Sequence, residues 1–180
     1  MDDDVRLMLS FQHGNIHDFE RLMQRHYKPT LNLARRFLSD PVLAEDVAQN
    51  VFLQVFKSAA GYRPAASFTT WLYTITRNAC YSELRRAVRR PGSLDDEAAP
   101  DPPAAAQPDS IEKDERQSAV RLAITALPDN QRMALILRRY DQLSYEQIAR
   151  AMETSVSAVK ALLHRARQSL KERLKEFVDE

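Results

Sequence analysis

Cysteine, glycine and clustered metal ligands are scarce in this chain of 180 residues, and each shortage excludes a class of site. With only Cys80, the chain cannot form an internal disulfide. His13 and His17 have helical spacing, but no HExxH-type motif or cysteine cluster accompanies them, so we predict no metal site. Three glycines form neither a P-loop nor a dinucleotide-binding loop. Nucleotide-dependent enzymes are therefore disfavoured, and we predict no cofactor.

Long apolar runs are also missing. A transmembrane helix needs roughly 18 to 20 consecutive apolar residues, and no uninterrupted run in the sequence approaches that length. The first residues, MDDDVRLML, lack the basic segment that begins a signal peptide. The composition is 44% hydrophobic with a net charge of +1, which is typical of a soluble globular protein. We expect a cytoplasmic protein without membrane insertion.

Strand patterns are absent, whereas signals for the beginnings of helices recur. Small polar residues before an apolar periodic segment cap the first backbone N–H groups of a helix. These signals are Asp40 before Pro41, Ser67 before a helix from Phe68 to about Arg90, Asp129 after Pro128, and a capping box formed by Ser144 and Gln147. The predicted fold class is all-α.

Charge divides the chain into three parts. Residues 1–90 have a net charge of +4 (13 basic, 9 acidic), residues 91–111 of −5 without a basic residue, and residues 112–180 of +2 (13 basic, 11 acidic). The acidic segment also contains five of the nine prolines and no aromatic residue. Such a composition cannot bury enough apolar surface to fold. We predict two small helical domains, 1–90 and 112–180, joined by a flexible linker at 91–111.

The C-terminal domain contains the pattern of a helix-turn-helix. A helix over 144–152, the short connection ETS and an amphipathic helix from Val156 have the required lengths and caps. The second helix of such a motif enters the major groove of DNA. On it, Ser157, Lys160, Ala161 and His164 are expected to face base edges, and Arg165, Arg167 and Lys171 to face phosphates. The alternative is an ordinary solvated helix face.

The helix over 67–90 combines an apolar stripe with a second, mixed face. Tyr73, Arg77 and Tyr81 recur at four-residue spacing and are followed by several arginines. Aromatic rings stack on unpaired bases, and arginines bind the phosphate backbone, so this face is suited to a single strand of nucleic acid. The alternative is that both tyrosines pack against a neighbouring helix.

Three segments together are similar to one protein family. DPVLAEDVAQNVFLQVF (40–56), FTTWLYTITRNACYSELRR (68–86) and LPDNQRMALILRRYDQLSYEQIARAMETSVSAVKALLHRAR (127–167) resemble the extracytoplasmic-function (ECF) group of bacterial sigma factors. The resemblance implies a transcription initiation factor without catalytic activity. Its implied partners are core RNA polymerase, promoter DNA and an anti-sigma factor.

The resemblance also assigns residues to three surfaces. The minus-35 element is read by the C-terminal helix-turn-helix, and the minus-10 element is recognised and opened by the N-terminal domain. The minus-35 set is Ser157, Lys160, Ala161, His164, Arg165 and Arg167. The minus-10 set is Tyr62, Arg63, Phe68, Trp71, Tyr73, Arg77 and Asn78. The polymerase-binding set is Glu45, Asp46, Gln49 and Asn50.

Two other functions fit parts of the sequence. A stand-alone helix-turn-helix regulator explains residues 128–175 but leaves FTTWLYTITRN without a role. A helical adaptor that binds only proteins explains the amphipathic helices but not the basic faces. The acidic linker also has two interpretations: simple solubility, or occupation of the polymerase channel that RNA later fills, as the resemblance implies.

Overall fold

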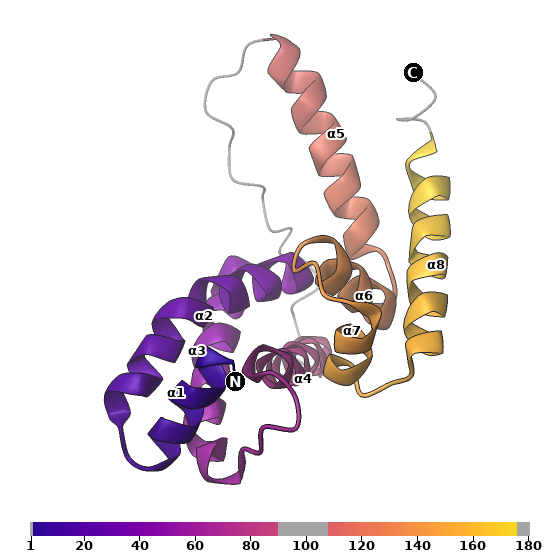
Figure 1. Cartoon of the computed structure of the whole chain (residues 1–180). Helices are drawn as coiled ribbons and strands as arrows, with labels where there is room; N and C mark the ends of the chain where they lie inside the picture. The colour runs from indigo at the N-terminus through magenta and orange to yellow at the C-terminus, as the bar shows by residue number, and fades with distance from the viewer. Residues whose placement is uncertain (1, 90–107, 176–180) are drawn as a thin grey trace.

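The computed structural model describes residues 2–89 and 108–175, and every regular element within them is helical (Figure 1). The all-α prediction is confirmed. The elements are α1 (Asp3–Gln12), α2 (Ile16–Leu38), α3 (Pro41–Ser58), a 3-10 turn η1 (Ala59–Gly61), α4 (Phe68–Arg89), α5 (Pro108–Thr125), α6 (Asp129–Arg139), α7 (Tyr145–Ala151) and α8 (Val156–Arg173). None of these helices is both long and apolar enough to cross a membrane.

Most of the predicted helix starts are confirmed by their side-chain hydrogen bonds. The Asp40 carboxylate accepts from the N–H groups of Val42 and Leu43 at 2.8 and 3.0 Å. At α7, Ser144 Oγ accepts from the N–H of Gln147 at 3.2 Å, and the Ser144 N–H donates to Gln147 Oε1 at 2.8 Å. These bonds satisfy backbone groups that the helix itself leaves without a partner.

The cap predicted at Asp129 is wrong. Pro128 holds the N-cap position of α6 and makes no side-chain cap, so Asp129 is the first helical residue. Its carboxylate accepts a hydrogen bond of 2.6 Å from Arg132, one turn along the helix. An acidic side chain in the first turn still suits the helix dipole.

The N-terminal domain packs α1 to α4 around an apolar core. On α3, Val47, Val51 and Val55 are buried at four-residue spacing, whereas Leu43 is half-buried. On α4, Phe68 and Leu72 of the apolar stripe are buried, whereas Ile75 and Ala79 are only partly buried. Thr76 and Cys80 are buried in place of these two. Burial raises the pKa of the Cys80 thiol to about 12, so this thiol stays protonated and unreactive at neutral pH.

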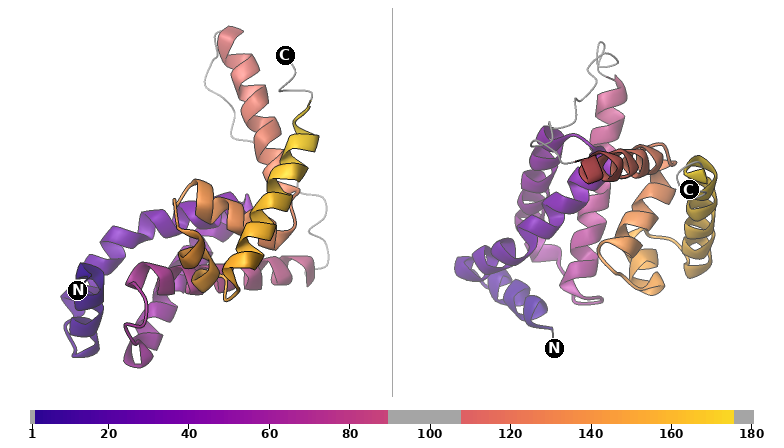
Figure 2. Two further views of the ribbon diagram at one scale, coloured as in Figure 1. Left: turned by 45° about the vertical axis from the view of Figure 1, so that its right-hand side comes forward. Right: turned by 90° about the horizontal axis from the view of Figure 1, so that it is seen from above.

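The C-terminal domain consists of α5 to α8. The inner face of α8 buries Val159, Leu163 and Ala166 against α6 and α7. The turn before α8 passes through Glu153, which has a left-handed φ of 52°. α5 also contacts α8, and both extend beyond the rest of the molecule (Figures 1 and 2). Residues 91–107 of the predicted linker lie outside the described residues, and 108–111 belong to α5.

The two halves of the chain pack against each other. α4 contacts α7, and α2 contacts α6, so the helix-turn-helix lies beside the N-terminal helices (Figure 2). One continuous cluster of buried apolar residues includes Phe37 and Leu72 from the first half and Met133 and Ile148 from the second. The relative placement of the halves therefore rests on a packed apolar contact as well as on polar bonds.

Candidate nucleic-acid interface

The outer face of α8 is open to solvent along the predicted contact row. Ser155 caps the helix, with its Oγ accepting from the N–H of Ala158 at 3.1 Å. The exposed side chains are Ser157, Lys160, Ala161, His164, Arg165 and Arg167. The local geometry follows from the sequence, because burial of Val159 and Leu163 turns the opposite side of the helix outward. This row presents hydrogen-bond donors and positive charge along a helix, an element that fits the major groove of DNA.

The mixed face of α4 is covered instead of exposed. The Tyr73 hydroxyl donates to Asp141 Oδ1 at 3.1 Å, and the Tyr81 hydroxyl donates to Asn130 Oδ1 at 2.8 Å. The guanidinium of Arg77 is paired with Glu153 and only 8% of the residue is exposed. The two tyrosines thus pack against a neighbouring part of the protein, as the alternative interpretation expected.

Burial changes the ionisation of these groups. Burial is the main cause of the raised pKa of Tyr73, and the charge of Asp141 raises this pKa further. Burial also raises the pKa of Tyr81 to about 12 and that of the Asp141 carboxyl above its usual value. Asp141 Oδ2 is buried without a hydrogen-bond partner in the described structure, so this carboxylate is incompletely satisfied.

The loop between α3 and α4 places its aromatic residues in the core. Tyr62 is 2% exposed and Phe68 is fully buried, with ring centroids 6.3 Å apart. Trp71 is half-buried against Tyr62 at 4.9 Å. Gln12 on α1 holds the loop by donating to the Tyr62 carbonyl at 3.0 Å. Helix packing thus leaves the rings of Tyr62 and Phe68, two residues of the predicted minus-10 set, no open face in this structure.

Two other residues predicted for the minus-10 element, Arg63 in the loop and Asn78 on α4, are accessible. Arg63 is exposed, and its guanidinium donates to the Tyr62 carbonyl at 3.0 Å. Asn78 is exposed, and its Oδ1 accepts from Arg77 at 2.7 Å. Asn78 also lines a cavity of about 450 Å³ between α3 and α4, together with Asn50. The structure brings one residue of the predicted polymerase-binding set and one of the minus-10 set to the same cavity.

The outer face of α3 carries the predicted polymerase-binding residues. Glu45, Asp46, Gln49 and Asn50 are all exposed, and Glu45 accepts from Arg35 at 2.7 Å. Apolar residues near them were missed by the sequence analysis: the exposed fractions are 68% for Val42, 56% for Leu53 and 48% for Phe56. The sequence could have indicated them, because they fall outside the four-residue repeat of apolar residues that are buried on α3. Exposed apolar residues bordered by polar ones are typical of a protein interface.

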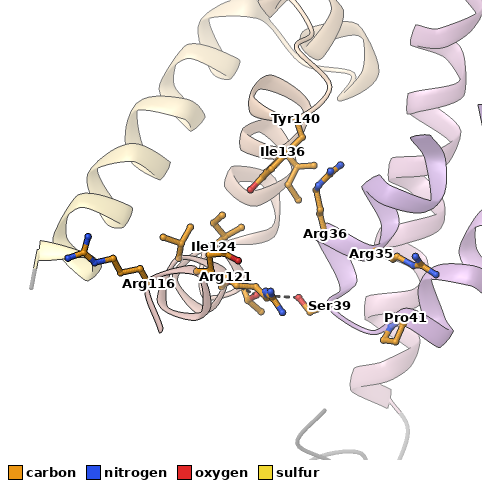
Figure 3. A pocket seen from close by; sticks show the side chains of 12 residues that line it. Arg35, Arg36, Ser39, Pro41, Arg116, Arg121, Ile124, Ile136 and Tyr140 are labelled. Atoms are coloured by element: carbon orange, nitrogen blue, oxygen red, sulfur yellow. Dashed lines mark hydrogen bonds between the residues drawn. The ribbon is translucent and has the colours of Figure 1, made fainter. Parts of the chain in front are cut away.

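A larger cavity of about 710 Å³ lies where α2 meets α5 and α6. Its lining combines Ile124, Ile136 and Tyr140 with four arginines. Figure 3 shows that Arg35 and Arg116 lie at opposite ends and that Arg36 points toward Ile136 and Tyr140. The Arg36 guanidinium stacks over the Tyr140 ring at 4.4 Å. The guanidinium groups do not converge on one point, so the cavity is not built as an anion site.

His13 and His17 lie on either side of the turn between α1 and α2, and each contacts a residue close in sequence. His13 Nδ1 lies 2.7 Å from the Leu9 carbonyl, and His17 Nδ1 lies 3.1 Å from Glu20 Oε2. Within residues 2–89 and 108–175, no group of three or more histidine, cysteine or acidic residues is arranged to hold a metal ion.

Comparisons with known proteins agree with this arrangement. Residues 22–90 match the family described as sigma-70 region 2, and residues 117–170 match sigma-70 region 4. The chain is 30% identical over 190 residues to the RNA polymerase sigma-H factor of Pseudomonas aeruginosa, covering 99% of this chain and 97% of that protein. It is 28% identical to the ECF RNA polymerase sigma-E factor of Escherichia coli, covering 97% and 96%.

Solved structures of similar proteins share the fold. CnrH in complex with the cytosolic domain of CnrY has a TM-score of 0.74 at 22% identity, covering 97% of this chain and 99% of that chain. The sigma factor RpoE of Bartonella quintana, solved with the anti-sigma factor NepR, has a TM-score of 0.71 at 26% identity, covering 91% and 99%. From these matches and the helix-turn-helix geometry, the chain belongs to the ECF group of RNA polymerase sigma factors.

Proposed function

We propose that this sigma factor directs core RNA polymerase to promoters through three separate surfaces. The outer face of α8 reads the minus-35 element, α4 with the preceding loop binds the minus-10 element, and the outer face of α3 binds the polymerase. In this function the chain supplies no catalytic activity, and it acts in the cytoplasm, where the polymerase is. The observation that carries the proposal is the continuous exposed row on α8, the second helix of a capped helix-turn-helix.

Side-chain chemistry supports the division of labour on α8. Lys160 and His164 lie one turn apart near the beginning of the helix and are exposed, which suits contacts with base edges. Ala161, between them, offers only an apolar contact, such as one with a thymine methyl group. Arg165 and Arg167 suit phosphates, which set position but not sequence preference.

The proposed minus-10 surface consists of accessible residues and residues that become accessible. Arg63 and Asn78 are exposed, whereas Tyr73 and Arg77 are covered by the C-terminal domain. Trp71 is half-buried and has part of its surface open. Tyr62 and Phe68 support this surface from the core without stacking on bases. α4 therefore carries most residues of this proposed surface. Tyr73 and Arg77 can contact DNA only after the two domains separate.

The proposed domain organisation assigns 1–90 to the polymerase and minus-10 functions, 91–111 to the linker and 112–180 to the minus-35 function, with α5 already beginning at Pro108 of the linker. An anti-sigma factor is the proposed regulator. The support for it is the solved complex of the Bartonella quintana sigma factor RpoE with NepR, whose sigma chain is 26% identical to this one.

Transcription from a library of random-sequence, promoter-length duplexes tests the proposal. The library is mixed with purified bacterial core RNA polymerase with or without the chain, and the transcripts are sequenced. We expect transcripts that share two upstream elements only when both proteins are present. Duplex binding by the chain alone, with no new transcripts when polymerase is added, would instead indicate a stand-alone regulator.

A further inference from the structure

In this molecule one proposed DNA-binding domain covers part of the other. Three residues spaced along one face of α4, Tyr73, Arg77 and Tyr81, each contact the helix-turn-helix domain. Their partners come from three places: Asp141 after α6, Glu153 in the turn before α8, and Asn130 at the start of α6.

The partners have the chemistry of a nucleic-acid backbone. Asp141 and Glu153 present carboxylate oxygens to a tyrosine hydroxyl and to a guanidinium. These two donors are the groups that bind phosphate oxygens in protein–nucleic acid complexes. The Tyr73 hydroxyl has one proton to donate, which Asp141 accepts, and the docked domain leaves only 8% of Arg77 exposed. Docking of the C-terminal domain and binding of a strand to this face therefore exclude each other.

Contacts beside this face keep the domain in place. Arg132 of α6 is 7% exposed and donates to the Phe37 carbonyl of α2 at 3.0 Å. Its guanidinium also lies 4.7 Å from the centre of the Phe37 ring. The Phe37 ring in turn contacts Tyr81 at 5.4 Å between centroids. The covered face of α4 is thus continuous with a packed contact between α2 and α6.

We propose that Asp141 and Glu153 form an intramolecular lock that occupies the nucleic-acid face of α4, so that the free chain binds single-stranded DNA there only after its domains separate. This inference rests on the proposed function of α4. The partner of the surface is a segment of the same chain, residues 129–153, and single-stranded DNA competes with it.

Glu153 is the point at which the lock can be tested without disturbing the core. Its side chain is 63% exposed, and Glu153→Arg keeps a non-glycine residue at the left-handed position, so the backbone cost is unchanged. The substitution places two cations together at Arg77. Glu172→Arg on exposed α8 is the control with the same change in net charge.

The first measurement follows separation of the domains in the full chain. Fluorophores are attached at Gln24→Cys on α2 and Lys171→Cys on α8, both exposed positions, while Cys80 stays buried and unreactive. Energy transfer is expected to fall in Glu153→Arg, stay unchanged in Glu172→Arg and recover in the exchange variant Arg77→Glu with Glu153→Arg. Unchanged transfer in both Glu153→Arg and Asp141→Lys/Glu153→Arg, with full helicity, would overturn the lock.

The second measurement is binding of labelled oligothymidylate to the same proteins. Opening is expected to strengthen binding roughly threefold to tenfold, the range for loss of a partly exposed ion pair and a hydrogen bond. Suppose that Glu153→Arg separates the domains without strengthening oligothymidylate binding, while Arg77→Ala weakens that binding. Residues 129–153 then do not compete with DNA, and the inference fails. If Arg77→Ala in the opened chain changes nothing, the proposed role of α4 fails, while the transfer measurement still reports the contact.

Discussion

The guanidinium of Arg132 on α6 donates a hydrogen bond of 3.0 Å to the backbone carbonyl of Phe37 at the end of α2 and stacks over the ring of the same residue. This single side chain therefore joins the two halves of the sigma factor by two different interactions. The carboxylate of Asp129, on the same helix, accepts a hydrogen bond of 2.6 Å from the other terminal nitrogen of this guanidinium.

We predict that Arg132→Lys weakens the contact between the domains, because lysine lacks the planar fork that makes both interactions. The expected loss is about 1–2 kcal/mol, or a fall of roughly 2–6 °C in the thermal midpoint. Arg138→Lys is the matched control. Arg138 also donates to a carbonyl, that of Leu143 at 2.8 Å, and stacks on Tyr145, but within one domain. Only Arg132→Lys should reduce energy transfer between the domains, and equal transfer in both variants would contradict this role.

The closed arrangement should depend on pH through Asp141. Burial raises the pKa of this carboxyl above 3.8, whereas the Tyr73 hydroxyl of α4 and Arg36 of α2, which face it, act in the opposite direction. A group whose pKa is raised in the closed state stabilises that state fully below the open-state pKa, near 3.8, and this contribution is lost as the pH rises through the closed-state value. The contribution of Asp141 to the closed state should therefore increase as the pH falls toward 4.

Asp141→Asn tests this dependence. Asparagine can still accept the Tyr73 hydrogen bond through its Oδ1 but carries no charge to bury. We expect its thermal midpoint at pH 7 to rise by roughly 1–2 °C and the pH dependence of the closed state to flatten. A pH profile identical to that of the unaltered chain would assign the dependence to another group.

Tyr62 should behave as a core residue. It is 2% exposed, and its hydroxyl is buried without a partner among the described residues. Tyr62→Phe removes an unsatisfied polar group and should leave the free energy of unfolding unchanged or slightly higher. Tyr62→Ala should cost about 3–5 kcal/mol by opening a cavity. Chemical denaturation measures both, and a destabilised Phe variant would show that the hydroxyl has a partner in solution.

Lys160 and His164 should contribute sequence-specific binding to the minus-35 element. Replacing either by alanine should weaken binding of the polymerase complex to a selected promoter by about 1–3 kcal/mol without loss of helicity. Lys175→Ala, an exposed lysine beyond the end of α8, is the control for a simple loss of positive charge. Filter binding at several salt concentrations measures the effect, and equal losses for Lys160 and Lys175 would indicate a non-specific phosphate contact.

Asp46 should contribute to binding of the polymerase. It is exposed on α3, close to the exposed Val42. Asp46→Arg reverses a charge at this surface and should lower the affinity for core polymerase at least tenfold, because charge pairs at partly desolvated interfaces contribute about 1.5–7 kcal/mol. Competition with a labelled sigma factor measures the affinity, and circular dichroism checks the fold. Glu20→Arg, at an exposed position on α2, is the matched control. Equal affinities of the two variants for core polymerase would show that the contact lies elsewhere.

The helices and the α8 contact row were predictable because they depend on local rules. Asp40 and Ser144 cap helices through residues two or three positions away, and these bonds are present as expected. The 3.6-residue period likewise separates buried Val159 and Leu163 from exposed Lys160 and His164 on one helix. Nothing outside the helix is needed to decide which side faces solvent.

The state of the α4 face was decided only by tertiary structure. Tyr73 and Asp141 are 68 positions apart, and Arg77 and Glu153 are 76 positions apart, so no helical period relates them. Tyrosine and arginine at four-residue spacing give the same sequence pattern whether they contact a nucleic-acid base or another domain. Burial of Tyr62 is decided in the same way, by α1 and α4 packing around its loop. The sequence determined the chemistry of these surfaces, and long-range packing determined which of them the closed molecule exposes.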